Sequence, residues 1–208
     1  YAEAGREIVC FSISAGMSTS GNVMRLAAEE LGASDRIKVI DSANLSTGIG
    51  LLVIEAAIMA KNNRTASQIV SEIERLKPNV RASFVVDTLT YLYRGGRCNA
   101  VAAMAGGVLK LHPRIVVEDG AMNASKKYRG KIASVVMNYV KDMEKYLKKA
   151  RPERVFITHS GCEQETVEKV RAYLKELDIF DEILETRAGG VVSSHCGPGT
   201  LGVLYIAK

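Results

Sequence analysis

Short apolar runs with the length of a β-strand alternate with helical segments through the first 87 residues. The predicted strands span residues 8–14, 37–41 and 82–87, and the predicted helices span residues 18–31, 46–61 and 65–76. Strands separated by helices of this length are typical of parallel sheets that are covered on both faces. The alternation therefore predicts an α/β fold that begins with a parallel, Rossmann-like sheet containing these strands.

The pattern changes after Asp87, where shorter strands and a small-residue helix over residues 99–109 follow. Further strands are predicted at residues 114–117, 154–158, 182–186 and 202–207, around a long helix over residues 130–150 that Pro152 ends and a helix over residues 163–177. We place the domain boundary close to Arg94. The sequence thus predicts a Rossmann-like α/β domain over residues 1–94 and a second α/β domain over residues 95–208 with a mixed or antiparallel sheet.

The cysteines are far apart in the sequence and form no Cys-x-x-Cys pair; they are Cys10, Cys98, Cys162 and Cys196. This spacing predicts free thiols in a reducing, cytoplasmic compartment, with neither a disulfide framework nor a structural metal site. The longest apolar stretch, residues 48–60, contains Glu55 and is too short to cross a bilayer. We therefore expect a cytoplasmic protein without an integral membrane segment.

Positive charge is concentrated in one stretch of the sequence. Ten of the 28 Lys and Arg residues, but three of the 23 Asp and Glu residues, lie within residues 126–154, so this stretch carries a net charge of +7 and the remaining chain −2. A local basic patch favours a docking surface, although a solvated face that only confers solubility has the same composition. Because no DNA-binding motif accompanies the patch, a regulatory protein that binds nucleic acid is the weaker alternative.

The loop after the first strand carries the first candidate site. Gly16 and Gly21 have the spacing of a phosphate-binding loop, but Asn22 and Val23 stand where its Lys and Ser or Thr belong. ATP is therefore not expected. Backbone amides and several hydroxyls could instead hold a small anion such as a carboxylate. A serine-capped helix after a turn explains the same residues equally well.

The segment Ser193–Gly202 carries the second candidate site, with His195 predicted in a loop just before the final strand. Gly197 and Gly199 allow the backbone to approach a ligand closely, and a histidine there can donate to a carboxylate. An incidental histidine in a surface loop is the alternative. The other two histidines, His112 and His159, are predicted to have packing roles.

No catalytic constellation accompanies these sites. The sequence has no His-Glu-x-x-His motif, no Gly-x-Ser-x-Gly motif and no close pair of acids beside a histidine. We therefore expect a binding protein with no catalytic residues of its own. A serine-dependent acyl hydrolase or transferase that uses Ser14 or Ser18 with His195 is the enzyme alternative.

Six segments together resemble the successive motifs of the DegV family of bacterial fatty-acid-binding proteins: SISAGMSTSGN, VIDSANLSTGIGLLVIEAA, FVVDTLTYLYRGGR, EDGAMNASKKYRGK, FITHSGCEQE and SSHCGPGTLGVLY. The resemblance implies a long-chain fatty acid enclosed in a tunnel between two domains, with no other cofactor. It also implies that the protein is the acyl-carrying subunit of a fatty-acid kinase, whose separate ATP-dependent subunit makes acyl-phosphate for phospholipid synthesis. The family usually has a further N-terminal segment with a Thr-Ser-Gln-Pro motif, and we expect that this segment is missing here.

The resemblance also assigns roles to residues. It implies that Ser14 and His195 hold the carboxylate. Ala15 replaces a second serine of the family's pattern, and if the ligand hydroxyl belongs to that second position, Ser12 or Ser18 takes the role instead of Ser14. The expected carboxylate site comprises Ser14, Ala15, Gly16, Ser18, His195 and Gly197. The expected acyl tunnel is lined by Met104, Val108 and Ile115, and the expected kinase-docking residues are Lys127 and Arg129.

Overall fold

The computed structural model describes residues 5–97 and 111–208. It divides into two compact units, the first made of Tyr1–Val80 with Asp119–Ala121 and the second made of Arg81–Glu118 with Met122–Lys208. This division comes earlier than the domain boundary expected near residue 94. The reason is that strand β3 (Val80–Val85) pairs within the sheet of the second unit and does not extend the sheet of the first.

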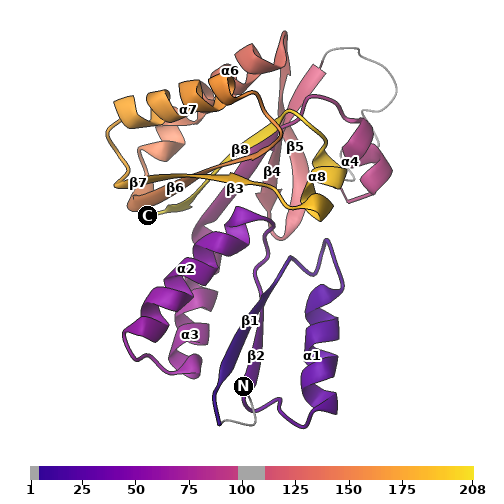
Figure 1. Ribbon diagram of the computed structural model, residues 1–208, viewed down its shortest axis with the longest axis vertical. Helices are drawn as coiled ribbons and strands as arrows, with labels where there is room; N and C mark the ends of the chain where they lie inside the picture. Colours follow the sequence, from indigo (N-terminus) through magenta and orange to yellow (C-terminus); the bar gives the residue numbers. More distant parts are fainter. Residues whose placement is uncertain (1–4, 98–110) are drawn as a thin grey trace. The chain divides into compact units, whose positions relative to one another are not determined.

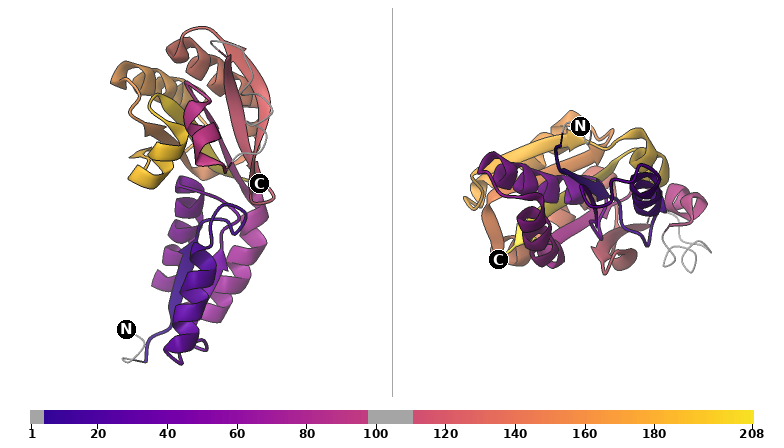
Figure 2. Two further views of the ribbon diagram at one scale, coloured as in Figure 1. Left: turned by 90° about the vertical axis from the view of Figure 1, so that its right-hand side faces the viewer. Right: turned by 90° about the horizontal axis from the view of Figure 1, so that it is seen from below.

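The first unit is a small parallel sheet with helices on both sides (Figure 1 and Figure 2). Strand β1 (Ile8–Ser12) pairs in parallel with β2 (Ile37–Asp41). Helix α1 (Ser20–Glu30) lies on one side of the strands, and α2 (Thr47–Lys61) and α3 (Ala66–Leu76) lie on the other. Because Ser12 and Asp41 are paired at the carboxyl ends of the strands, the two following loops leave the sheet at the same edge.

A six-stranded sheet forms the centre of the second unit, in the order β5-β4-β3-β8-β6-β7. Its other strands are β4 (Leu111–Glu118), β5 (Ala121–Arg129), β6 (Ala150–Ser160), β7 (Glu182–Arg187) and β8 (Thr200–Ala207). Strand β4 is antiparallel to β3, and β6 is parallel to β7 but antiparallel to β8. The sheet is therefore mixed, which confirms the predicted α/β fold with one small parallel sheet and a second mixed sheet.

Helices α6 (Ile132–Leu147) and α7 (Gln164–Glu176) lie side by side on one face of the second sheet (Figure 1). Their apolar faces are buried against strand residues that point to the same side. Residues of this core include Val85, Tyr139, Val140, Met143, Val155, Ile157, Val170, Leu174 and Val203. Two shorter helices, α4 (Thr90–Gly95) and α8 (Gly190–Cys196), pack against each other.

Several local predictions are wrong. The strand predicted at residues 82–87 is β3 of the mixed sheet and not a third parallel strand. Pro152 lies within β6 and not at the end of the long helix. The register of β6 with β8 shifts between Ala150 and Val155, and a proline is tolerated in a strand at such an irregularity. The basic segment up to Arg129 is part of β5, whereas the sequence reading had no strand there. The helix predicted at residues 99–109 lies outside the described residues.

In the part of the chain that the structure describes, none of the helices is long and apolar enough to span a bilayer.

Candidate functional site

The loop after β1 is anchored by Ser14, which is 2% exposed. Its hydroxyl donates to the carbonyl oxygen of Gly120 at 2.6 Å and accepts from the amide of Gly16 at 3.1 Å. Its own amide donates to Asn44 O at 2.9 Å in the loop after β2. Ser14, which was predicted to bind the fatty-acid carboxylate, thus donates its hydroxyl proton within the first unit, because Gly120 also belongs to that unit.

The carboxylate of Asp41 is held by one amide of this loop and by one amide of the loop after β2. Ala15 N lies 3.3 Å from both Asp41 oxygens, and Ala43 N donates to Asp41 Oδ1 at 2.9 Å. Ala15 and Gly16 are themselves exposed. The sequence reading missed Asp41, although its place as the last residue of β2, at the same edge as the Ser14 loop, was a usable signal.

Gly16 and Gly21, which have the spacing of a phosphate-binding loop, are required here by close packing. A Cβ on Gly16 would lie 2.9 Å from Gly120 O, and a Cβ on Gly21 would lie 2.7 Å from Ser12 Oγ. Ser18 is half-buried, and its Oγ lies 2.8 Å from Ser20 Oγ and accepts from Ser20 N at 3.2 Å. Ser18 therefore satisfies the amide of the first residue of α1, although the N-cap residue is Thr19 and makes no side-chain capping bond.

His195 lies in the last turn of α8 and not in a loop, which corrects the sequence reading. The helix was missed because a seven-residue segment flanked by glycines carries little periodic signal. The imidazole is half-buried. Neither of its nitrogens has a hydrogen-bond partner among residues 5–97 and 111–208.

The other two histidines differ from His195 because both of their ring nitrogens have partners. His159 Nε2 lies 3.3 Å from Glu185 Oε1, and its Nδ1 accepts from an amide. His112 lies 3.1 Å from Val86 O through Nδ1 and 3.0 Å from Gly130 O through Nε2. Both are buried, as a packing role requires. His195 is therefore the histidine with free capacity to bind a ligand in the described chain.

Two glycines make close contacts beside His195: Gly95 lies against the imidazole, and Gly197 lies against the Tyr91 ring. A Cβ on Gly95 of α4 would lie 2.2 Å from His195 Nδ1, and a Cβ on Gly197 would lie 2.3 Å from the Tyr91 ring. Gly197 also has a φ of +78°, a conformation that favours glycine. The structure thus gathers His195 and Gly197 with α4 in the second unit, and gathers Ser14, Ala15, Gly16 and Ser18 in the first.

The described cysteines, Cys10, Cys162 and Cys196, are free thiols. Burial raises the pKa of the Cys162 thiol to about 12 and also raises the pKa of Cys196. Both thiols are therefore protonated near neutral pH and are poor nucleophiles. Within residues 5–97 and 111–208, no cluster of three or more His, Cys, Asp or Glu side chains could hold a metal ion.

The predicted acyl-lining residue Ile115 is fully buried on β4 and pairs opposite Phe84 of β3. Side chains alternate between faces along a strand, and Val85, beside Phe84, belongs to the core under α6 and α7. Ile115 and Phe84 therefore belong to the other face of the sheet. That face is apolar and buried, with Ala82, Phe84, Ile115, Val117, Phe156 and Leu204. The other two expected lining residues, Met104 and Val108, lie outside the described residues.

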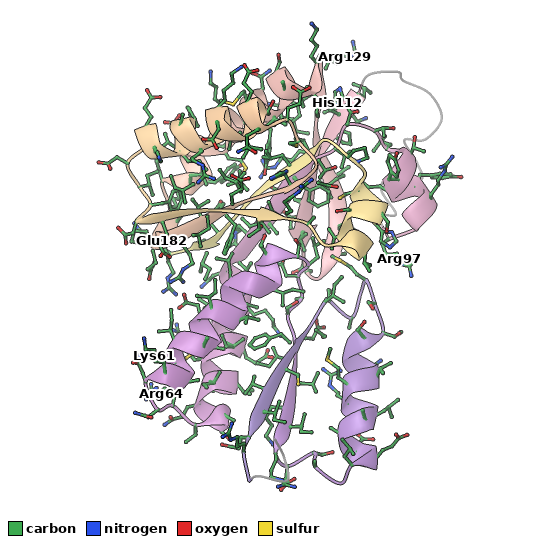
Figure 3. All side chains as sticks on the ribbon, viewed as in Figure 1. Lys61, Arg64, Arg97, His112, Arg129 and Glu182 are labelled. Carbon is green, nitrogen blue, oxygen red and sulfur yellow. The ribbon has the colours of Figure 1, made fainter. Side chains whose placement is uncertain are left out.

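The predicted docking residues Lys127 and Arg129 are exposed on β5. Figure 3 shows the Arg129 side chain pointing away from the ribbon at the end of the strand. Their neighbour Lys126 differs, because its ammonium group pairs with Asp142 at 2.5 Å. The structure therefore presents two basic side chains outward from the same strand.

Comparisons with known proteins agree on one family. The model of the DegV family matches residues 1–208. A DegV domain-containing protein of Deinococcus radiodurans is 33% identical over 207 residues, which are 98% of this chain and 72% of that protein. The structure of a fatty-acid-binding DegV family protein from Thermus thermophilus is similar with a TM-score of 0.88 at 27% identity, and the match covers 100% of this chain and 74% of that one. DegV of Bacillus subtilis, a fatty acid binding protein, has a TM-score of 0.78 at 27% identity, over 97% of this chain and 71% of that one. The chain therefore belongs to the DegV family.

Proposed function

We propose that this chain is a cytoplasmic protein that binds one long-chain fatty acid and presents its carboxylate to a separate ATP-dependent kinase. The observation that carries the proposal is family membership together with two relatives, each 27% identical, that bind fatty acids. In this proposal the acyl chain is enclosed between the two units. Acyl-phosphate is made by the kinase, and the chain itself supplies binding and orientation.

His195 donates one of the hydrogen bonds to the carboxylate. Its half-buried imidazole carries an N–H group that no described residue accepts, so a ligand oxygen can take it. Removing a carboxylate from water costs several kcal/mol unless donors replace the lost water. An imidazole N–H in a partly buried setting is such a donor, and it becomes stronger when the ring is protonated.

Ser14 donates the second hydrogen bond. Its hydroxyl proton is directed at Gly120 O at 2.6 Å, so ligand binding requires that this proton turns to the carboxylate. Asp41 stays bound to Ala15 N and Ala43 N and holds the loop in place beside the ligand. The loop amides therefore shape the site without contacting the fatty acid directly.

The acyl chain lies against the apolar face that carries Ile115, with Met104 and Val108 completing the lining. About sixteen carbons gain on the order of 12 kcal/mol on transfer from water, at about 0.8 kcal/mol per methylene group. Part of this gain is offset by the lost freedom of the chain and of the protein. Burial of the acyl chain thus provides affinity, and the two polar donors fix the position of the head group.

Lys127 and Arg129 form the docking contact for the kinase. Exposed charges of one sign mainly raise the rate of encounter with an oppositely charged partner. We expect that Lys127→Glu with Arg129→Glu lowers acyl-phosphate formation by an added fatty-acid kinase subunit while fatty-acid binding is unchanged. A reversal at Lys175, an exposed lysine on α7, is the control. Equal loss in both variants, or no loss in either, contradicts the assigned surface.

Calorimetric titration of the delipidated chain with hexadecanoic acid tests the binding function. The wild type is expected to bind one molecule, and His195→Ala is expected to bind about 10- to 100-fold more weakly because a hydrogen bond to a charged group is lost. Ser194→Ala is the matched control, because that hydroxyl donates within α8, to Val191 O at 2.8 Å, and has no other hydrogen bond among the described residues. Absence of binding by the wild type contradicts the proposal.

A further inference from the structure

The two residues at the end of α4 are both glycines, but for different physical reasons. Gly96 caps the helix with a φ of +64°, a left-handed conformation that favours glycine. Gly95 is the last helical residue and has no such φ. Alanine is the better helix former at such a position. Nothing in the backbone of α4 therefore requires a glycine at residue 95.

The His195 side chain is what requires a glycine at residue 95. A Cβ at residue 95 would lie 2.2 Å from His195 Nδ1, 3.1 Å from Cε1 and 3.2 Å from Cγ, and the first distance is far below any real contact. The imidazole thus occupies the space that any larger side chain at residue 95 would fill. Because no described residue forms a hydrogen bond with the ring, packing against α4 is what sets its orientation.

The surrounding contacts keep this arrangement in place. Arg97 Nη1 donates to the carbonyl oxygen of Gly95 at 2.8 Å and so fixes the end of α4. The Tyr91 ring, one turn earlier on α4, packs directly against Gly197, two residues after the histidine. Since Nδ1 is the ring atom nearest to the Cβ position of Gly95, Nε2 is the nitrogen that lies farther from this residue.

We propose that Gly95 is a positioning residue for the fatty-acid carboxylate. By lacking a Cβ, it lets the His195 imidazole seat against α4 with Nε2 free to donate to the ligand. The proposal rests on the proposed function for its ligand, but not for the seating of the ring. Gly95→Ala is expected to push the imidazole away from α4 and to weaken binding without disrupting either sheet.

The first test does not depend on the ligand. The chain has three histidines, so an ¹⁵N-histidine-labelled sample gives three sets of imidazole NMR signals, and His195→Ala identifies one of them. Gly95→Ala is expected to shift the His195 signals and to leave those of His112 and His159 unchanged, which also shows that the second unit is folded. Unshifted His195 signals overturn the proposal, whether or not the chain binds fatty acid.

The second test is a double-mutant cycle on the affinity for hexadecanoic acid. Gly95→Ala alone is expected to weaken binding about 10- to 100-fold, as the loss of one hydrogen bond to a charged group does. In the His195→Ala background the same change is expected to have no further effect, because the empty space left by the histidine accepts the added methyl group. The control is Gly190→Ala on α8, which has open space around its Cβ.

The outcomes distinguish failure of the proposed fatty-acid binding from failure of the positioning role of Gly95. If the wild type does not bind hexadecanoic acid while Gly95→Ala shifts the His195 signals, the proposed function fails and the seating of the ring stands. If the wild type binds and the effects of Gly95→Ala and His195→Ala are additive, Gly95 acts by another route and its positioning role is overturned. An equal loss in Gly190→Ala also overturns it.

Discussion

Tyr139→Phe removes a single buried hydroxyl that joins α6 to the middle of the second sheet. The side chain is fully buried, and its hydroxyl donates to Ser83 O at 2.7 Å and accepts from Val203 N at 3.0 Å. Ser83 lies on β3 and Val203 on β8, which are neighbours in the sheet. The hydroxyl therefore bridges a carbonyl and an amide of adjacent strands, and it also lies 3.0 Å from Ser83 Oγ; phenylalanine removes this shared partner from both strands.

The expected loss follows from these two groups. A buried polar group that loses its partner costs about 1–3 kcal/mol. With partial relaxation of the strands, Tyr139→Phe is expected to lower the free energy of unfolding by about 2–4 kcal/mol at pH 7. Burial also raises the pKa of Tyr139 to about 12, above the value of 10.0 expected in the unfolded chain. The wild type therefore loses this contribution as the pH rises from 10 toward 12, and its advantage over the variant shrinks there.

Urea unfolding followed by circular dichroism measures the loss, and hydrogen exchange at the Val203 amide localises it to the second unit. Tyr146→Phe is the matched control on the same helix, because Tyr146 is 45% exposed, and a change within about 0.5 kcal/mol is expected there. A cost below about 1 kcal/mol for Tyr139→Phe, or unchanged exchange at Val203, refutes the bridging role of the hydroxyl.

Three further changes test local contacts. Ser14→Ala leaves Gly120 O without its donor and is expected to cost about 1–2 kcal/mol in urea unfolding, whereas unchanged stability contradicts the contact. Lys126→Gln removes the hydrogen bond that is the largest cause of the lowered pKa of Asp142, so the variant is expected to be less stable near pH 6. That difference should vanish as the pH falls below 3.8, the usual value for the carboxyl, and a difference that persists in acid contradicts the assignment. Thr65→Ala removes the N-cap of α3 and is expected to cost about 1 kcal/mol, measured by thermal unfolding; an unchanged melting temperature contradicts this.

Local sequence signals were sufficient to predict most helices and strands of the first unit. The helix predicted over residues 65–76 forms as α3, and its N-cap Thr65 makes a capping box with Gln68. The strand at Ile37–Asp41 has the predicted bounds. These elements are defined by neighbouring residues, so periodicity and capping patterns reveal them.

Strand partners could not be predicted in the same way. The sequence of β3 is a buried apolar run that fits a parallel or an antiparallel sheet equally well, and its pairing with β4 is decided far along the chain. The predicted third parallel strand was wrong for this reason. The same applies to Pro152, which is compatible with β6 only because the register shifts there.

The candidate site shows the same limit. His195 was found from its glycine-rich surroundings, but its short helix and its contact with Gly95, one hundred positions earlier, have no local signature. Asp41 was missed because its bond to Ala15 depends on two loops meeting at one sheet edge. Residue types thus indicated the chemistry, whereas its arrangement required the packed structure.

Native mass spectrometry of the chain as purified from cells tests directly whether it carries a fatty acid. The protein mass is expected to be increased by that of one long-chain fatty acid, which is recovered by solvent extraction and reduced in occupancy in His195→Ala. A spectrum that contains only the bare protein, and that stays unchanged after incubation with excess hexadecanoic acid, contradicts it.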